Sequence, residues 1–149
     1  MSVKIAGLWE LNWTTPLVES WMWTFPLREF EVSQWAMYPV TGIYQNKLAP
    51  NPSGLTEFHN MAEMVKDFPD DHTRVFVDEK GETPLNEFVH PEKACYILGC
   101  AGNNALFLKE PEDKSVFIPT KNPSGVLWPH QCLLTVLYDR RIKELQNEV

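Results

Sequence analysis

The stretch that decides the fold runs from Phe88 to Arg140. It contains the segments FVHPEKACYILGCAGNN (88–104), SVFIPT (115–120) and SGVLWPHQCLLTVLYDRR (124–141). Two short apolar runs rich in β-forming residues, Ala94–Leu98 and Ser115–Ile118, end at Gly99 and Pro119. A glycine-containing loop and a strongly apolar helix follow the second run. Because glycine lets the backbone approach a ligand closely, these features predict a cleft that binds a flat cofactor through main-chain groups.

The length and composition indicate one globular domain spanning residues 1–149. Of the 149 residues, 44% are hydrophobic and 22% are charged, which is typical of a soluble protein. No apolar run approaches the roughly 20 residues of a membrane span. The N-terminus also lacks the basic and apolar segments of a signal peptide. We therefore expect no association with a membrane.

Cysteine usage and charge narrow the class of protein further. Cys95, Cys100 and Cys132 are odd in number and form no C-x-x-C pair, so they are interpreted as buried thiols in a reducing cytoplasm. No histidine or carboxylate spacing predicts a metal site. The net charge of −7 argues against a large, non-specific nucleic-acid surface. It does not exclude RNA, because a dimer can assemble a local basic patch.

Strand and helix patterns alternate along the chain. The expected strands are Val3–Leu8, Gln34–Tyr38, Thr73–Val77, Cys95–Leu98 and Val116–Ile118. Three helices are expected. The first runs from Pro16 to about Phe25, with Thr15 as its N-cap and Pro26 ending it. The second is capped by Thr56 and ends at Pro69, and the last begins at Pro129. Short helices or turns are expected at Leu85–Val89 and Asn103–Lys109, with a loop at Pro39–Gly54. This order predicts an α/β fold with a mostly parallel five- or six-stranded sheet and helices on both faces.

Over Thr73–Arg141, about half of the chain, the sequence resembles the SPOUT family of α/β methyltransferases. Tyr96–Gly102 stands where the RNA-methylating branch of that family has a V-L-G-x-E-G-like signature after its fourth strand. Ile118–Thr120 matches the I-P-T that ends the fifth strand, and Val126–Trp128 with Leu133–Tyr138 matches the third motif. The resemblance implies a C-terminal trefoil knot over about residues 94–145.

The resemblance also implies a cofactor, a site and partners. The cofactor would be S-adenosylmethionine, the substrate would be RNA (a tRNA or rRNA), and the protein would be a homodimer. Three loops would surround the adenine and ribose of the cofactor, and their residues are Leu98, Gly99, Cys100, Ala101, Gly102, Ile118, Pro119, Thr120, Gly125, Val126 and Leu127. The last helix, apolar nearly all round, gives an independent reason to expect a dimer.

Several positions depart from the family's motifs. Ala101 replaces the acidic residue of the second motif and Trp128 replaces the asparagine of the third. Glu19 stands near the place of a helix-borne arginine. Candidates for the group that handles the substrate proton are therefore Asn12, Glu19 and His130. Two alternatives stay open, a SPOUT-fold binding protein without catalysis and a methyltransferase that acts on a protein.

A few other residues attract a functional interpretation. Five of the six tryptophans precede residue 36, and Trp13 is the best candidate for stacking on a substrate or cofactor. Trp21 and Trp23 are two residues apart on the expected helix, so at least one is expected to be exposed. His90, which precedes a proline, is interpreted as a turn residue. The basic residues 140, 141 and 143 are interpreted as a helix end that complements the helix dipole.

Overall fold

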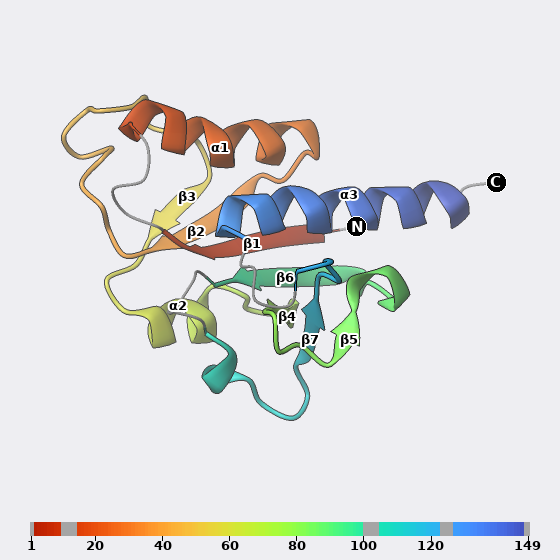
Figure 1. The fold of residues 1–149 in the computed structure, drawn as a ribbon. Coiled ribbons are helices and arrows are strands. Elements are labelled where there is room, and N and C mark those ends of the chain that lie inside the picture. Colours follow the sequence, from red (N-terminus) through yellow and green to blue (C-terminus); the bar gives the residue numbers. More distant parts are fainter. Residues whose placement is uncertain (1, 10–14, 100–104, 123–126, 148–149) are drawn as a thin grey trace.

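The computed structural model describes residues 2–9, 15–99, 105–122 and 127–147. All of the described strands form one parallel sheet (Figure 1). Its order is β3 (Leu55–Glu57), β2 (Gln34–Tyr38), β1 (Ser2–Leu8), β6 (Lys93–Leu98), β4 (Thr73–Val77), β7 (Lys114–Phe117) and β5 (Thr83–Pro84). The described part of the chain thus has seven strands, where the sequence predicted five or six.

Helices cover both faces of this sheet (Figure 1). α1 (Pro16–Glu29) and α3 (Pro129–Asn147) lie next to each other on one face, and α2 (Met61–Asp67) lies on the other. Two 3-10 turns, η1 (Leu85–Glu87) and η2 (Leu106–Leu108), fall within the predicted short segments. The α/β class, the parallel sheet and the helices on both faces are therefore confirmed. The trefoil knot and the single domain over 1–149 remain predictions.

Side chains of the central strands alternate between the two faces of the sheet. Ile5 of β1 and Tyr96 of β6 belong to the core beneath α1 and α3, whereas Ala6 and Ile97 belong to the core on the side of α2. All four are buried. Near-continuous apolar strands are what a parallel sheet covered on both faces requires, and they explain the β-rich runs in the sequence.

Three tryptophan rings form the centre of the core beneath α1. The Trp23 ring stacks against Trp9 and Trp35, with centroid separations of 6.2 and 6.3 Å. Gly7 leaves room for this ring, because a Cβ atom there would lie 2.5 Å from it. Trp21 is 41% exposed while Trp23 is fully buried, as their spacing predicted.

The segment before α2 differs from the prediction. Thr56, expected to cap this helix, lies in β3 and pairs with Ala36 of β2. The N-cap is Asn60, whose side-chain oxygen accepts a hydrogen bond from the Glu63 N–H at 2.9 Å. β3 and β5 are three and two residues long. Such short strands show no alternating pattern, and this is why the sequence did not reveal them.

α1 also runs past its predicted end. Thr15 caps it as expected, accepting a hydrogen bond from the Val18 N–H at 3.4 Å. The helix then continues through Pro26 to Glu29. A proline inside a helix costs about 3 kcal/mol. Leu27, the next residue, is buried in the core, and burying a leucine side chain contributes roughly 1.5–3 kcal/mol, so packing offsets most of that cost.

Candidate functional site

The carboxyl ends of the central strands meet at one edge of the sheet. Leu98, the last residue of β6, is paired with Gly7 near the end of β1 and with Val77 at the end of β4. β7 lies on the other side of β4, and its Val116 is paired with Val77. Because the sheet is parallel, the segments that follow these strands leave from the same edge. In open α/β sheets, ligands bind in the crevice at this edge.

Two of the three predicted cofactor loops begin at this carboxyl edge. Leu98 is fully buried and Gly99 is half-buried. Ile118 is half-buried, and Pro119 and Thr120 are exposed. Thr120 Oγ1 donates a hydrogen bond to the Asn122 carbonyl at 3.3 Å. The remaining predicted residues of these two loops, Cys100, Ala101 and Gly102, lie outside the described residues.

The third predicted loop precedes α3. Of its residues, Leu127 is half-buried, while Gly125 and Val126 lie outside the described residues. The first turn of α3 lies against the core at the end of β1, because the His130 ring contacts the edge of Trp23, and Trp23 in turn stacks on Trp9 just after β1. The start of α3 is therefore at the carboxyl edge, next to the segment that follows β1.

Main-chain groups at this edge suit the recognition that the sequence predicted. Apart from the sheet ladder, no backbone hydrogen bond among the described residues involves Ile118, Pro119 or Thr120. Among the described residues, the carbonyl groups of Pro119 and Thr120 are thus available to bond the edges of a flat ligand. By contrast, the Trp128 N–H already donates to Gln131 Oε1 at 2.8 Å. The residues present at the edge are compatible with an adenosine-like group held by backbone.

Two of the three candidates for proton handling lie at this edge. Glu19 and His130 are 4% and 6% exposed. Burial lowers the pKa of His130, and the nearby Glu19 carboxylate opposes this effect only in part. The main cause of this lowered pKa is the burial of the imidazole. Asn12, the third candidate, and Trp13 lie outside the described residues.

A buried polar atom beside the candidate site has no partner. Within the described part of the chain, His130 Nε2 and Trp23 Nε1 are both buried without a hydrogen-bond partner. Their rings are in contact, 6.3 Å apart at an interplanar angle of 84°. A buried polar group without a partner is costly, so a ligand group that bonded to His130 Nε2 would relieve that cost.

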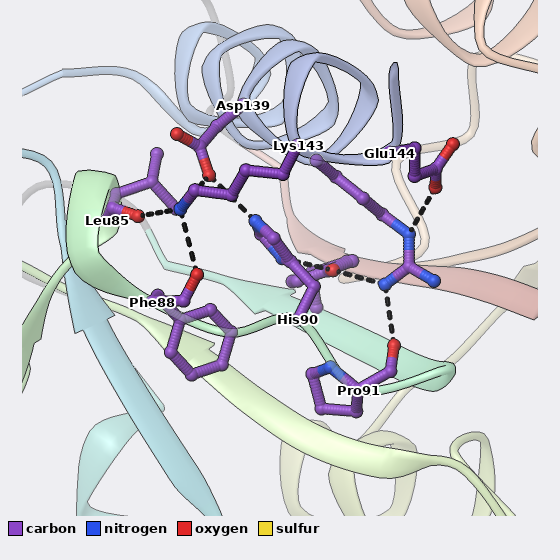
Figure 2. A network of polar contacts seen from close by, with 9 residues as sticks. Leu85, Phe88, His90, Pro91, Asp139, Lys143 and Glu144 are labelled. Carbon is purple, nitrogen blue, oxygen red and sulfur yellow. Dashed lines mark hydrogen bonds and ion pairs between the residues drawn. The ribbon is translucent and has the colours of Figure 1, made fainter. Parts of the chain in front are cut away.

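A second group of polar side chains, which the sequence did not reveal, lies away from this edge (Figure 2). His90 Nδ1 is 2.7 Å from the Tyr96 hydroxyl, and His90 Nε2 is 2.7 Å from Asp139 Oδ2. Lys143 Nζ lies 2.8 Å from the same Asp139 oxygen. Arg140 Nη1 donates to the Tyr96 hydroxyl at 2.8 Å. We call these five residues the His90 network.

The His90 network ties α3 to the segment before β6. Arg140 donates to the carbonyls of Pro91 and Glu92, at 2.7 and 3.1 Å, and Lys143 donates to those of Leu85 and Phe88. The interpretation of the basic cluster as a helix end was therefore wrong for these two side chains. His90 lies in a connecting segment, as expected, but its side chain is 6% exposed. Because 49 residues separate it from Asp139, no local pattern signalled the pair.

Two further kinds of feature are absent from the described ranges. No group of three potential metal ligands gathers there. None of the helices there is both long enough and apolar enough to cross a bilayer.

No protein-family model and no curated protein matches the sequence. Solved structures do match. A structure described as giving structural insights into the 2-OH methylation of C/U34 on tRNA has a TM-score of 0.70 and 12% identity, over 96% of this chain and 92% of the other. A TrmH-family RNA methyltransferase of Porphyromonas gingivalis, described as putative, has a TM-score of 0.69 and 14% identity, over 94% and 60%.

A third match carries a cofactor. The SpoU methyltransferase AviRb of Streptomyces viridochromogenes, in complex with AdoMet, has a TM-score of 0.69 and 12% identity, over 97% of this chain and 58% of the other. This chain thus spans about three fifths of the Porphyromonas and Streptomyces proteins. At these identities the likeness establishes the fold, and it confirms the SPOUT resemblance at that level. The chain has the fold of the TrmH and SpoU RNA methyltransferases.

Proposed function

We propose that this protein binds S-adenosylmethionine at the carboxyl edge of its sheet and transfers the methyl group to RNA. One observation carries the proposal: the segments predicted from the sequence to hold the cofactor start at a single sheet edge, in a fold shared with an AdoMet-bound methyltransferase. The position also agrees with the general rule for ligand sites in parallel sheets.

In this proposal the chain binds the cofactor mostly through its backbone. The main chain after Leu98, at Ile118–Thr120 and at Leu127 holds the adenine and ribose. The buried and unpartnered His130 Nε2 provides a polar contact at the start of α3. The bound cofactor supplies a methyl group activated by a positive sulfur. Glu19 and His130 are the described side chains best placed to orient the acceptor or move its proton.

The nature of the acceptor separates the proposal from two alternatives. RNA is favoured because the matching Porphyromonas structure is described as a TrmH-family RNA methyltransferase and another match concerns methylation of tRNA. A protein acceptor agrees better with the net charge of −7, which repels a phosphate backbone and attracts a basic target. A binding protein without catalysis agrees with Glu19, Ala101 and Trp128, which stand where the family's motifs have an arginine, an acidic residue and an asparagine.

Titration calorimetry with S-adenosylmethionine tests the cofactor first. Saturable binding is expected. No heat of binding at millimolar S-adenosylmethionine would rule out both the RNA methyltransferase and the protein methyltransferase. Transfer of tritiated methyl groups to bulk RNA and to bulk protein then identifies the acceptor. Transfer to protein alone would replace RNA with a protein substrate. Cofactor binding without transfer to either would favour the inactive binding protein.

We also propose a homodimer formed through α3. Leu134, Tyr138 and Leu145 recur at helical spacing on the outer face of this helix, and they are 50%, 59% and 46% exposed. An apolar stripe of this kind is unusual on a monomer surface. The cytoplasm is the proposed location, because Cys95 and Cys132 are free thiols.

A further inference from the structure

A groove runs along α1 on the side of the molecule that carries β2 and β3. It has a volume of about 650 Å³ and lies between α1 and the segment 50–53. Its floor is apolar, with the buried residues Leu27, Val32 and Trp35. The groove extends along α1 from Ser20 and passes the end of the helix at Glu29 to reach Glu31. It therefore lies along the same helix that carries Glu19 in its first turn.

An exposed pair of aromatic rings stands at the mouth of this groove. Trp21 and Phe25 lie one helical turn apart, and they are 41% and 47% exposed. Their rings stack with centroids 5.6 Å apart and an interplanar angle of 14°. The guanidinium of Arg28 lies over the Phe25 ring, 5.2 Å from its centroid. α1 thus presents two parallel rings and a cation in one row along its exposed side.

The facing wall of the groove is fixed in place. Trp35 Nε1 donates to the Ser53 carbonyl at 3.3 Å. Gly54 has φ +78° and packs so closely that a Cβ atom there would lie 1.9 Å from the Ser33 carbonyl oxygen. The segment 50–53 is therefore held against the sheet, and the groove exists before any ligand arrives. A preformed site costs less conformational entropy on binding than one that must close.

The chemistry of the groove distinguishes between kinds of ligand. The flat ring pair offers a stacking surface for a planar group. Arg28 makes no ion pair within the described residues, so its charge can complement an anion. Thr24, Ser33 and Asn51 line the groove with hydroxyl and amide groups, and Glu31 can accept hydrogen bonds from an amino group. A planar base with polar edges, linked to a phosphate, satisfies all of these features.

We propose that this groove binds an unpaired nucleotide of a single-stranded RNA segment. The base stacks on the exposed Trp21 ring, which Phe25 supports from its other side. The edge of the base contacts the polar wall, and Arg28 holds a phosphate. Unpaired bases stacked on aromatic and arginine planes are the usual mode of RNA recognition. The proposal rests on the proposed function, since it assigns part of the RNA substrate to a place outside the cofactor site. A proline-rich peptide, which also binds aromatic grooves, is the competing ligand.

Fluorescence anisotropy with a labelled single-stranded RNA of about a dozen nucleotides tests this assignment. Trp21→Ala is expected to weaken binding by about 5- to 150-fold, the loss that corresponds to one base–aromatic stack. Phe25→Ala removes the ring that supports Trp21 and is expected to weaken binding by a smaller factor. Arg28→Ala is expected to weaken RNA binding. It should also make the negative slope of log affinity against log salt concentration shallower by about 0.7, the value of one phosphate contact. Arg28→Lys should restore the salt slope, because it keeps the charge, without restoring full affinity.

Two more variants make the test independent of α1. Asn51→Trp fills the groove from its opposite wall and is also expected to weaken RNA binding. Phe107→Ala is the matched control, because Phe107 is an exposed aromatic residue on η2. The RNA affinity of this variant should equal that of the unmodified protein. A duplex of the same sequence should bind more weakly than the single strand. Thermal melting confirms that each variant is folded.

Several results would overturn the assignment. They are the absence of single-strand binding at low salt, unchanged affinity in Trp21→Ala, Phe25→Ala and Asn51→Trp, or binding of a proline-rich peptide that RNA does not displace. Calorimetry with S-adenosylmethionine on the same variants keeps this proposal separate from the proposed function. Unchanged cofactor affinity with lost RNA binding supports the groove, whereas no cofactor binding in any form refutes only the methyltransferase.

Discussion

His90 Nε2 lies 2.7 Å from Asp139 Oδ2, although 49 residues separate the two in the chain. A neutral His90 with its proton on Nε2 satisfies every contact in the His90 network. It donates to Asp139 and accepts at Nδ1 from the Tyr96 hydroxyl, which in turn accepts from Arg140. Burial raises the pKa of Tyr96 to about 12, so this hydroxyl keeps its proton. A charged His90 would place two donors against Tyr96.

We expect the free energy of unfolding to fall on acidification below neutral pH. The folded structure lowers the pKa of His90 from 6.5, mainly through burial, and Asp139 offsets only part of this effect. Below pH 6.5 the unfolded chain then binds more protons, so stability is full above that pH and is lost as the pH falls through the folded pKa. His130 shifts in the same direction. Urea denaturation between about pH 5 and pH 8 measures this dependence.

His90→Asn is the control for the pH experiment. It removes one of the two titrating groups, so its stability should depend less on pH than that of the unmodified protein. A stability that stays constant or rises between neutral pH and about pH 5 would contradict the assignment of a neutral, buried His90.

The His90–Asp139 contact should appear as a coupling energy. In a double-mutant cycle with His90→Ala and Asp139→Ala, we expect about 0.5–3 kcal/mol of coupling in the free energy of unfolding, because both partners share one buried network. The matched control is the Lys93–Asp71 pair, whose side chains are more than half exposed. That pair should show no measurable coupling. Equal coupling in the two cycles would argue against a special role for the buried network.

Two neighbouring tryptophans should respond very differently to substitution. Trp23→Ala removes the middle ring of the buried stack and should lower the free energy of unfolding by about 3–5 kcal/mol. Trp21→Ala removes an exposed ring that contacts Phe25, and it should cost at most about 1.5 kcal/mol. Denaturant titrations of the two variants give the comparison. Similar costs would mean that α1 does not present the faces described.

Gly99→Val should abolish binding of S-adenosylmethionine without unfolding the protein. The added side chain would fill the space where the backbone after β6 is proposed to meet the cofactor. Val89→Ala, which changes an exposed residue before β6, should bind the cofactor normally. Calorimetry on both variants decides the matter. Full affinity in a folded Gly99→Val protein would place the cofactor elsewhere.

Charge introduced on the outer face of α3 should separate the proposed dimer. Tyr138→Glu and Leu134→Glu each place a carboxylate in an apolar stripe, where an interface would have to desolvate it. Sedimentation analysis should therefore show a shift from dimer to monomer. Phe107→Glu, which changes an exposed aromatic residue on η2, should leave the dimer intact. A protein that is monomeric before substitution would refute the interface.

The fold was predictable where local pattern and final structure agree. β2 and β4 occupy the predicted residues because each is an apolar run between turn-forming residues. Since parallel strands share an edge, the placement of Leu98 and Ile118 at the same edge of the sheet also followed from the sequence. Features that depend on contacts between residues far apart in the chain could not be predicted from local patterns. Leu27 extends α1 past Pro26 because it is buried, and the buried side chain of His90 is explained only by Asp139.

Substitutions at the two edges of the sheet are expected to change different properties, ligand recognition at one edge and stability at the other. The proposed cofactor loops follow the strands at one edge, and Arg140 and Lys143 bind α3 to backbone carbonyls between residues 85 and 92, before β6 begins. An engineer could therefore raise the melting temperature of this protein around residues 85–92 and the second half of α3 without redesigning ligand recognition. The loops after β6 and β7 could in turn be diversified in a library while the rest of the scaffold keeps the chain folded.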